Sequence, residues 1–208
     1  MKKIIIVISC LLSASAHAQQ ANTTFDGRNW QAPYALPIPK GWSIERFLLP
    51  PAFAPQIKYK GVEDIRFTPG WGNSKTNDYW SYAFLWYLDD KYKISKKTIE
   101  ADLEAYYNGL LKENTDSTKA LTEAQMPAVV KLKQSVTEGH ETLYSGEIIM
   151  RDFLSRQRII LNAKVHLSFC PDAERTILYF ELSPKPFTDE VWDGLDSLWT
   201  DFKCTKDQ

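Results

Sequence analysis

The sequence contains few of the residues from which metal centres and most catalytic sites are built. Its 208 residues include three histidines, three cysteines and nine glycines. It has no His-Glu-x-x-His or Cys-x-x-Cys spacing, no glycine-rich phosphate-binding loop and no Gly-x-Ser-x-Gly turn. We therefore expect no metal, no cofactor and no catalytic residue of these classes.

The chain also lacks an excess of positive charge. Lysine and arginine together number 25, against 26 aspartates and glutamates, which gives a net charge of −1 at pH 7. A protein that binds nucleic acid needs a basic surface to neutralise the phosphates. The charge balance therefore argues against a nucleic-acid partner.

One apolar run, over residues 4–12, lies at the start of the chain. It follows two lysines and precedes Ala16-His17-Ala18, which is the order of a signal peptide with cleavage after Ala18. The run is too short to span a bilayer stably, and no other apolar run is long enough to do so. The segment ending at Cys10 loosely resembles a lipoprotein cleavage box, which leaves lipidation as an alternative. We expect a mature chain without a transmembrane segment that is periplasmic or secreted.

Cleavage after Ala18 would leave two cysteines, Cys170 and Cys204. An even pair in an oxidising compartment favours a disulfide. Because Cys170 ends a predicted strand and Cys204 follows the last predicted helix, a bridge would attach that helix to the strand. The alternative is two separate buried thiols.

The clearest structural signal is a β-hairpin over residues 159–182, where apolar residues alternate with mostly polar ones. Residues 170–175 form the predicted turn between its two strands. Pairing Cys170 with Arg175 places Val165 opposite Phe180, so the apolar faces of the two strands match. From Pro127 onward, the pattern predicts a four-stranded antiparallel meander that ends with this hairpin.

Two amphipathic helices are predicted, over residues 95–112 and 188–203, with Ser95 and Thr188 as their N-caps. Residues 80–88 alternate as a strand with a heavy aromatic face. Residues 56–60 and 63–67 predict two short strands around Gly61, or one bulged strand. We therefore predict a single α+β domain over residues 36–208, an antiparallel sheet with two packed helices, after a flexible lead-in over residues 19–35.

The aromatic residues are the most unusual part of the composition. Trp71 and Trp42 are bracketed by glycine and proline in predicted loops, and Tyr79 follows the Trp71 loop. Exposed aromatic side chains on loops stack on sugars or insert into a partner's pocket. We take Trp71, Trp42 and Tyr79 as candidate binding residues. The alternative is that the loop tryptophans fold back over the sheet.

Acidic pairs and one histidine are the remaining candidates for chemistry. Glu63-Asp64 and Asp89-Asp90 could supply the two carboxylates of a glycosidase, although such doublets at strand ends are common in turns. Neither histidine of the mature chain has a partner at metal-ligand spacing. We expect His166 to be a solvated residue on the polar face of the hairpin, opposite Tyr179.

The order of elements, with Pro39-Lys40-Gly41-Trp42 leading into strands and a closing helix that carries Leu195, Leu198 and Phe202, resembles the PsbP-like fold, which includes periplasmic DcrB-like proteins. The resemblance covers about residues 36–203. It implies a non-enzymatic accessory or assembly role on a larger complex. No residue of this chain matches a metal or partner motif of that family.

Three functional hypotheses remain. The first is an exported, non-catalytic envelope protein that binds a protein partner or an envelope glycan through Trp71 and Trp42. The second is a carbohydrate-active hydrolase that uses Glu63, Asp64, Asp89 or Asp90. The third is a structural accessory subunit. Carboxylates that face each other across a cleft would favour the hydrolase, and an exposed aromatic surface would favour binding.

Overall fold

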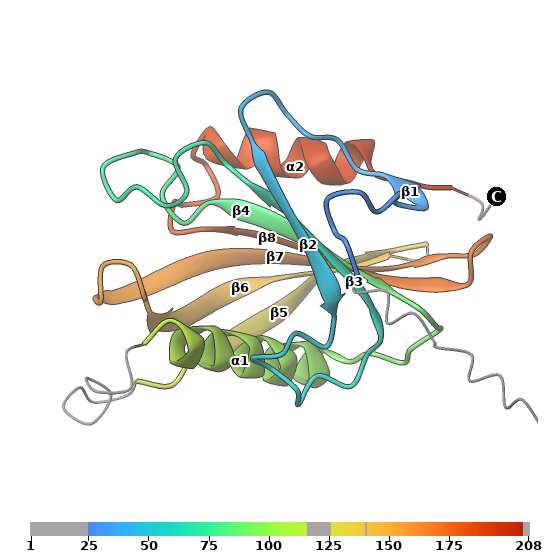
Figure 1. Cartoon of the computed structure of the whole chain (residues 1–208), viewed down its shortest axis with the longest axis horizontal. Coiled ribbons are helices and arrows are strands. Elements are labelled where there is room, and N and C mark those ends of the chain that lie inside the picture. Colours follow the sequence, from blue (N-terminus) through green and yellow to red (C-terminus); the bar gives the residue numbers. More distant parts are fainter. Residues whose placement is uncertain (1–24, 116–125, 140, 206–208) are drawn as a thin grey trace, which may run out of the picture.

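The computed structural model describes residues 25–115, 126–139 and 141–205, which form a seven-stranded antiparallel sheet with a helix on each face (Figure 1). The order of elements is β1 (Tyr34–Ala35), β2 (Ser43–Leu49), β3 (Gly61–Phe67), β4 (Tyr82–Leu88), α1 (Lys96–Glu113), β5 (Val129–Glu138), β6 (Glu141–Arg151), β7 (Arg158–Cys170), β8 (Arg175–Ser183), α2 (Val191–Asp201) and β9 (Lys203–Cys204). Strands follow the order β2-β3-β4-β8-β7-β6-β5, and β1 pairs with β9 separately. The structure is α+β, with more strands than the predicted meander.

Strands β4 and β8 lie in the middle of the sheet and are covered on both faces. Every residue of β4 is buried, which explains why its sequence is almost continuously apolar. Phe84 and Trp86 face the core under α1, where Phe84 stacks on Phe180 at a ring-centroid distance of 4.3 Å. Leu85 and Tyr87 face the core under α2. The sheet therefore separates two apolar layers.

The predicted hairpin is confirmed in its register. Cys170 pairs with Arg175, and Val165 pairs with Phe180. Strands β5, β6, β7 and β8 also pair consecutively and antiparallel, as the meander prediction requires. Local alternation of apolar residues was therefore sufficient to predict this half of the sheet.

The proline-rich region contains an edge strand that the sequence pattern did not predict. β2 follows Trp42 and ends just before Pro50, at the end of the sheet, where a neighbouring proline interrupts no pairing. The strand predicted over residues 56–60 does not form. β3 begins instead at Gly61, where an added Cβ would lie 2.1 Å from the Tyr87 carbonyl oxygen, so the close packing of two backbones requires glycine there.

Both predicted helices form, but the start of the second differs. Thr98 N–H donates to Ser95 Oγ at 3.2 Å, which confirms Ser95 as the cap of α1. The predicted cap at Thr188 is wrong, because α2 begins three residues later with Glu190 at the N-cap position. The Asp189 carboxylate accepts from Val191 N–H at 3.1 Å and satisfies one of the free donors at this helix end. No helix in the described ranges is long and apolar enough to cross a membrane.

Residues 25–37, which we call the N-terminal strap, lie against the α2 face of the sheet together with the C-terminal strand. Tyr34 pairs with Cys204, and its buried hydroxyl donates to Asp64 at 2.9 Å. The predicted disulfide joins Cys170 to Cys204, with a Cα–Cα distance of 5.8 Å. The lead-in predicted over residues 19–35 is therefore packed from Phe25 onward. The predicted signal peptide over residues 1–18, and residues 19–24, lie outside the described residues.

Candidate functional site

A cleft of about 690 Å³ runs along β2, which crosses the front of the view in Figure 1 beside the blue N-terminal strap. Its lining consists of residues 25–28 of the strap, residues 43–46 of β2, Phe67 and Trp71. The strap forms one wall, and Phe67 with Trp71 forms the other. A volume of this size is within the range of small-ligand sites.

Trp71 forms the aromatic wall of the cleft. Its ring stacks on Phe67 with a centroid distance of 4.4 Å and an interplanar angle of 26°, and it meets the Trp80 ring edge-on at 6.4 Å. Trp80 is buried, whereas Trp71 is only half-buried. One side of the Trp71 ring therefore packs against Phe67 and Trp80, and another side borders the cleft.

The loop that carries Trp71 is held at its base by hydrogen bonds. Gly70 N–H donates to Asp78 Oδ2 at 2.8 Å, and Thr76 Oγ1 donates to Gly70 O at 2.8 Å. Partial burial raises the pKa of Asp78, but the hydrogen bonds from Gly70 and Thr76 outweigh burial and bring the pKa below its ordinary value. Asp78 therefore stays ionised at neutral pH, and the loop presents Trp71 in a fixed position.

The opposite wall is a tight turn at the start of the strap. Asp26 Oδ1 accepts from Arg28 N–H at 3.0 Å, and Asp26 Oδ2 accepts from the Asn29 side-chain amide at 2.7 Å. These hydrogen bonds lower the pKa of Asp26. An added Cβ on Gly27 would lie 2.3 Å from Arg46 O, so the turn can approach β2 this closely only with glycine.

A buried ion cluster fixes the strap against β2 and β3. Asp64 forms ion pairs with Arg46, at 2.9 Å from Nε, and with Arg66. Arg66 also donates to two carbonyl oxygens of the strap, at 2.9 and 3.1 Å. Because Asp64 is fully buried and Arg46 lines the cleft, this cluster determines the position of one wall.

The other two candidate binding residues lie elsewhere. Trp42 packs on α2, where an added Cβ on Gly194 would lie 3.4 Å from its ring. The Tyr79 hydroxyl donates to Asp152, and the Tyr79 ring packs against the core under α1. Of the three aromatic residues chosen from the sequence, Trp71 is the one that lines the cleft.

The four acidic residues considered for a glycosidase do not converge. Glu63 and Asp64 are neighbours in β3 and point to opposite faces of the sheet, as strand geometry requires. Glu63 accepts from the Tyr106 hydroxyl of α1 at 2.8 Å, whereas Asp64 lies under the strap. Asp89 and Asp90 are exposed in the turn after β4. None of the four lines the cleft along β2, so the described structure does not place two of them across it.

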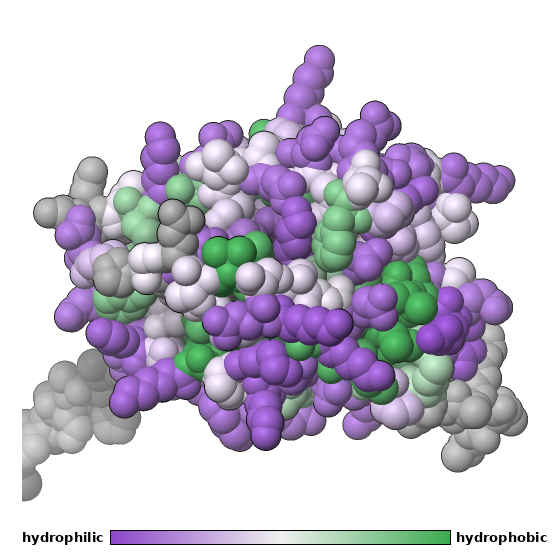
Figure 2. Space-filling model, turned by 180° about the vertical axis from the view of Figure 1, so that it is seen from behind, coloured by the Kyte–Doolittle hydropathy of each residue, from purple (hydrophilic) through white to green (hydrophobic). Residues whose placement is uncertain are grey.

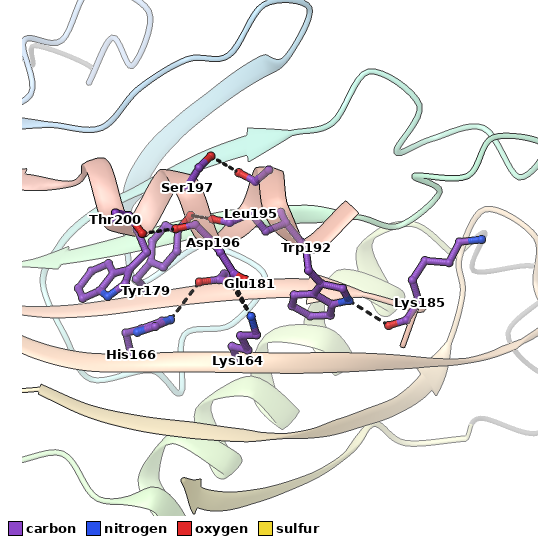
Figure 3. A network of polar contacts seen from close by, with 12 residues as sticks. Lys164, His166, Tyr179, Glu181, Lys185, Trp192, Leu195, Asp196, Ser197 and Thr200 are labelled. Carbon is purple, nitrogen blue, oxygen red and sulfur yellow. Dashed lines mark hydrogen bonds and ion pairs between the residues drawn. The ribbon is translucent and has the colours of Figure 1, made fainter. Parts of the chain in front are cut away.

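A second polar site, between the sheet and α2, surrounds His166 (Figure 3). His166 Nδ1 lies 2.6 Å from Glu141 Oε1, and Nε2 lies 2.9 Å from Glu181 Oε1. The Trp199 ring of α2 packs at a tilt of 31° against the imidazole, with a centroid distance of 4.7 Å, and its Nε1–H donates to Glu141 at 3.1 Å. The predicted pairing of His166 with Tyr179 is confirmed. The prediction of a solvated histidine is wrong, because α2 covers this part of the hairpin and His166 is buried.

Glu181 is the most buried member of this network. Burial raises its pKa to about 7, the hydrogen bond from His166 lowers it in part, and the neighbouring Asp196 carboxylate raises it. Lys164 bonds to Asp196 of α2 and lies 3.9 Å from Glu181. These contacts attach α2 to the hairpin. The register predicted from the sequence already places Lys164 opposite Glu181. This pairing is the one feature of the sequence that could have indicated the network.

Comparison with known proteins does not assign this chain to a family: no protein-family model matches it, and no curated protein matches it. The resemblance to the PsbP-like fold therefore stays a prediction. Within the described residues, no group of three or more histidine, cysteine, aspartate or glutamate side chains is arranged to hold a metal ion.

Proposed function

We propose that this chain is an exported, non-catalytic binding protein of the bacterial envelope, and that its ligand contacts Trp71 in the cleft along β2. The observation that carries the proposal is the placement of a half-buried tryptophan, stacked on Phe67, in the wall of a cleft of about 690 Å³. Aromatic rings held in this way provide large contact areas with little loss of side-chain entropy on binding.

The composition of the cleft supports binding over catalysis. Its lining contains neither histidine nor cysteine, and its two carboxylates are Asp26 of the strap and Glu45 of β2. Asp26 is already engaged in the turn of the strap. A nucleophile beside a positioned general base is therefore not formed by the lining residues.

The reverse side of the molecule offers a weaker alternative. Figure 2 shows mostly polar side chains on that side, with apolar residues in separate patches. A broad docking face would require a larger contiguous apolar surface. This favours the cleft as the contact site for a protein partner or an envelope glycan.

The test is tryptophan fluorescence of the purified chain, titrated with peptidoglycan fragments, envelope glycans, short peptides and lipid vesicles. We expect a saturable change with one of these probes that Trp71→Ala removes and that the matched variant Trp42→Ala retains. Both are half-buried loop tryptophans, but only Trp71 lines the cleft. A response that Trp71→Ala leaves intact, or the absence of any response, would contradict the proposal.

A further inference from the structure

The cleft is lined by residues from both faces of β2, which is the outermost strand of the sheet among the described residues. Ser43 and Glu45 share a face of β2 with Phe67, because Ser43 pairs directly with Phe67. Ile44 and Arg46 point to the other face, where Arg46 meets Asp64 under the strap. All four consecutive residues of β2 nevertheless line the cleft. An occupant must therefore lie beside the backbone of this edge strand.

The two edge strands of the sheet, β5 and β2, differ in how their outer backbone groups are bonded. At the far edge, side chains of Asn108, Glu104 and Glu100, spaced four residues apart on α1, accept from the backbone N–H groups of Ala128, Val130 and Leu132 at 2.8, 3.1 and 2.8 Å. These bonds occupy the donors that another strand would need. At the near edge, β2 has β3 as its one strand partner among the described residues. The strap touches β2 at Gly27 but pairs with β9 instead.

The cleft carries a negative charge on one face of β2 and a positive charge on the other. This arrangement suits a bound peptide whose side chains alternate between the two faces. Glu45 lies on the face of Phe67 and Trp71, and Arg28 lies on the strap side. Both side chains are exposed in the lining, and the charge of Arg28 also acts on the neighbouring Asp26, whose pKa it helps to lower. A strand added here would offer its alternate side chains to the two faces in turn.

We propose that the ligand is an extended peptide segment that binds as an additional strand on the outer edge of β2. Its backbone pairs with β2, a large apolar side chain contacts Trp71, a basic side chain on the same face meets Glu45, and an acidic side chain on the opposite face meets Arg28. This mode of binding, β-strand addition, takes affinity from the main chain and specificity from alternate side chains. The proposal rests on the proposed function, because it uses the same cleft.

The experiment is selection of short random peptides on the purified chain, followed by an N-methyl scan of the best binder. N-methylation removes one backbone donor at a time. We expect losses of roughly tenfold or more at alternate positions and tolerance at the positions between them, since only every second amide of an edge strand faces its partner. Trp71→Ala should weaken binding by about tenfold to a hundredfold.

Charge reversal gives a matched control on exposed residues. Glu45→Lys should shift the selected peptides from basic to acidic residues on the face that contacts Trp71, and Arg28→Glu should shift the other face from acidic to basic. Peptides that bind without the alternating N-methyl pattern would overturn strand addition and leave the proposed binding function standing. If a glycan binds in a Trp71-dependent way and no peptide is selected, strand addition is also overturned and the proposed binding function stands. No Trp71-dependent binding of any probe would overturn both.

Discussion

Glu63 and Asp64 are adjacent in one strand, yet they lie in opposite environments. Glu63 faces the aromatic layer under α1, where it accepts a hydrogen bond from the neutral hydroxyl of Tyr106. Asp64 faces the strap, where two arginines and the Tyr34 hydroxyl surround it. Both side chains are fully buried. The comparison shows that burial alone does not determine what a carboxyl group does in this fold.

The difference lies in the groups that surround each carboxyl group. Burial without a cation raises the pKa of Glu63 to about 8, and the hydrogen bond from Tyr106 offsets this only in part. Asp64 instead serves as the shared anion for Arg46 and Arg66, whose charges would otherwise be buried unpaired. One face of the sheet thus holds a neutral acid at neutral pH, and the other holds an ion cluster.

The largest expected effect is that of Asp64→Ala. The substitution leaves two guanidinium groups without their anion and should lower the free energy of unfolding by about 3–5 kcal/mol. Urea denaturation at pH 7 measures this. Asp89→Ala is the control, because the Asp89 side chain is 59% exposed and its pair with Arg175 should contribute at most about 1 kcal/mol. Equal effects of the two variants would show that the cluster does not stabilise the fold.

The second-largest expected effect is a pH-dependent change in stability caused by Glu63. Because its pKa is raised on folding, its favourable contribution is complete below the unfolded value near 4.5 and is lost as the pH rises to about 8. Glu63→Gln keeps the neutral form, so at pH 9 it should be more stable than the wild type by roughly 2–4 kcal/mol, with little difference at pH 4. Denaturation curves at both pH values test this. Glu147→Gln, at an exposed position of β6, is the control and should show no such gain.

Glu181 should behave like Glu63 to a smaller degree. Its pKa of about 7 places the loss of stability between pH 4.5 and 7, and His166 offsets part of the effect of burial. Glu181→Gln should therefore gain roughly 1–2 kcal/mol at pH 9 relative to the wild type. A loss of stability at pH 9 would mean that the ionised carboxylate holds α2 more strongly than its burial costs.

The smallest expected effect concerns a single hydrogen bond at the end of α2. Trp199→Phe keeps an aromatic ring beside His166 but removes the Nε1–H that donates to Glu141. It should cost about 1 kcal/mol, which thermal unfolding can detect. The comparison is Trp42→Phe, because the Trp42 indole forms no hydrogen bond with the described residues. An unchanged melting temperature would show that solvent replaces the lost donor.

Much of the fold was predictable because its signals are local. Apolar alternation gave the β5–β8 meander and the register of its last hairpin, and Ser95 marked the start of α1. Strand β2 was missed because prolines flank it and its residues are mostly exposed, so its alternation is weak. The strap was taken for a flexible lead-in, since Tyr34 gains its stability from Asp64, thirty residues away.

The candidate site was predictable only in part. A tryptophan bracketed by glycines in a loop indicated Trp71, but nothing in the sequence showed that the strap would form the opposite wall of its cleft. His166 had no partner at a recognisable spacing, because Glu141 and Glu181 come from different strands and Trp199 from a helix. Such sites depend on pairing between distant segments.

By itself, the sequence determined that Glu63 and Asp64 point to opposite faces, because successive side chains alternate in any strand. It also determined the register of the last hairpin through matching apolar faces. Only the tertiary structure decided which face received arginines and which received tyrosines, since these partners come from the strap, β2 and α1. It likewise decided that side chains of α1 bond to the outer backbone donors of β5, whereas β2 has β3 as its one strand partner among the described residues.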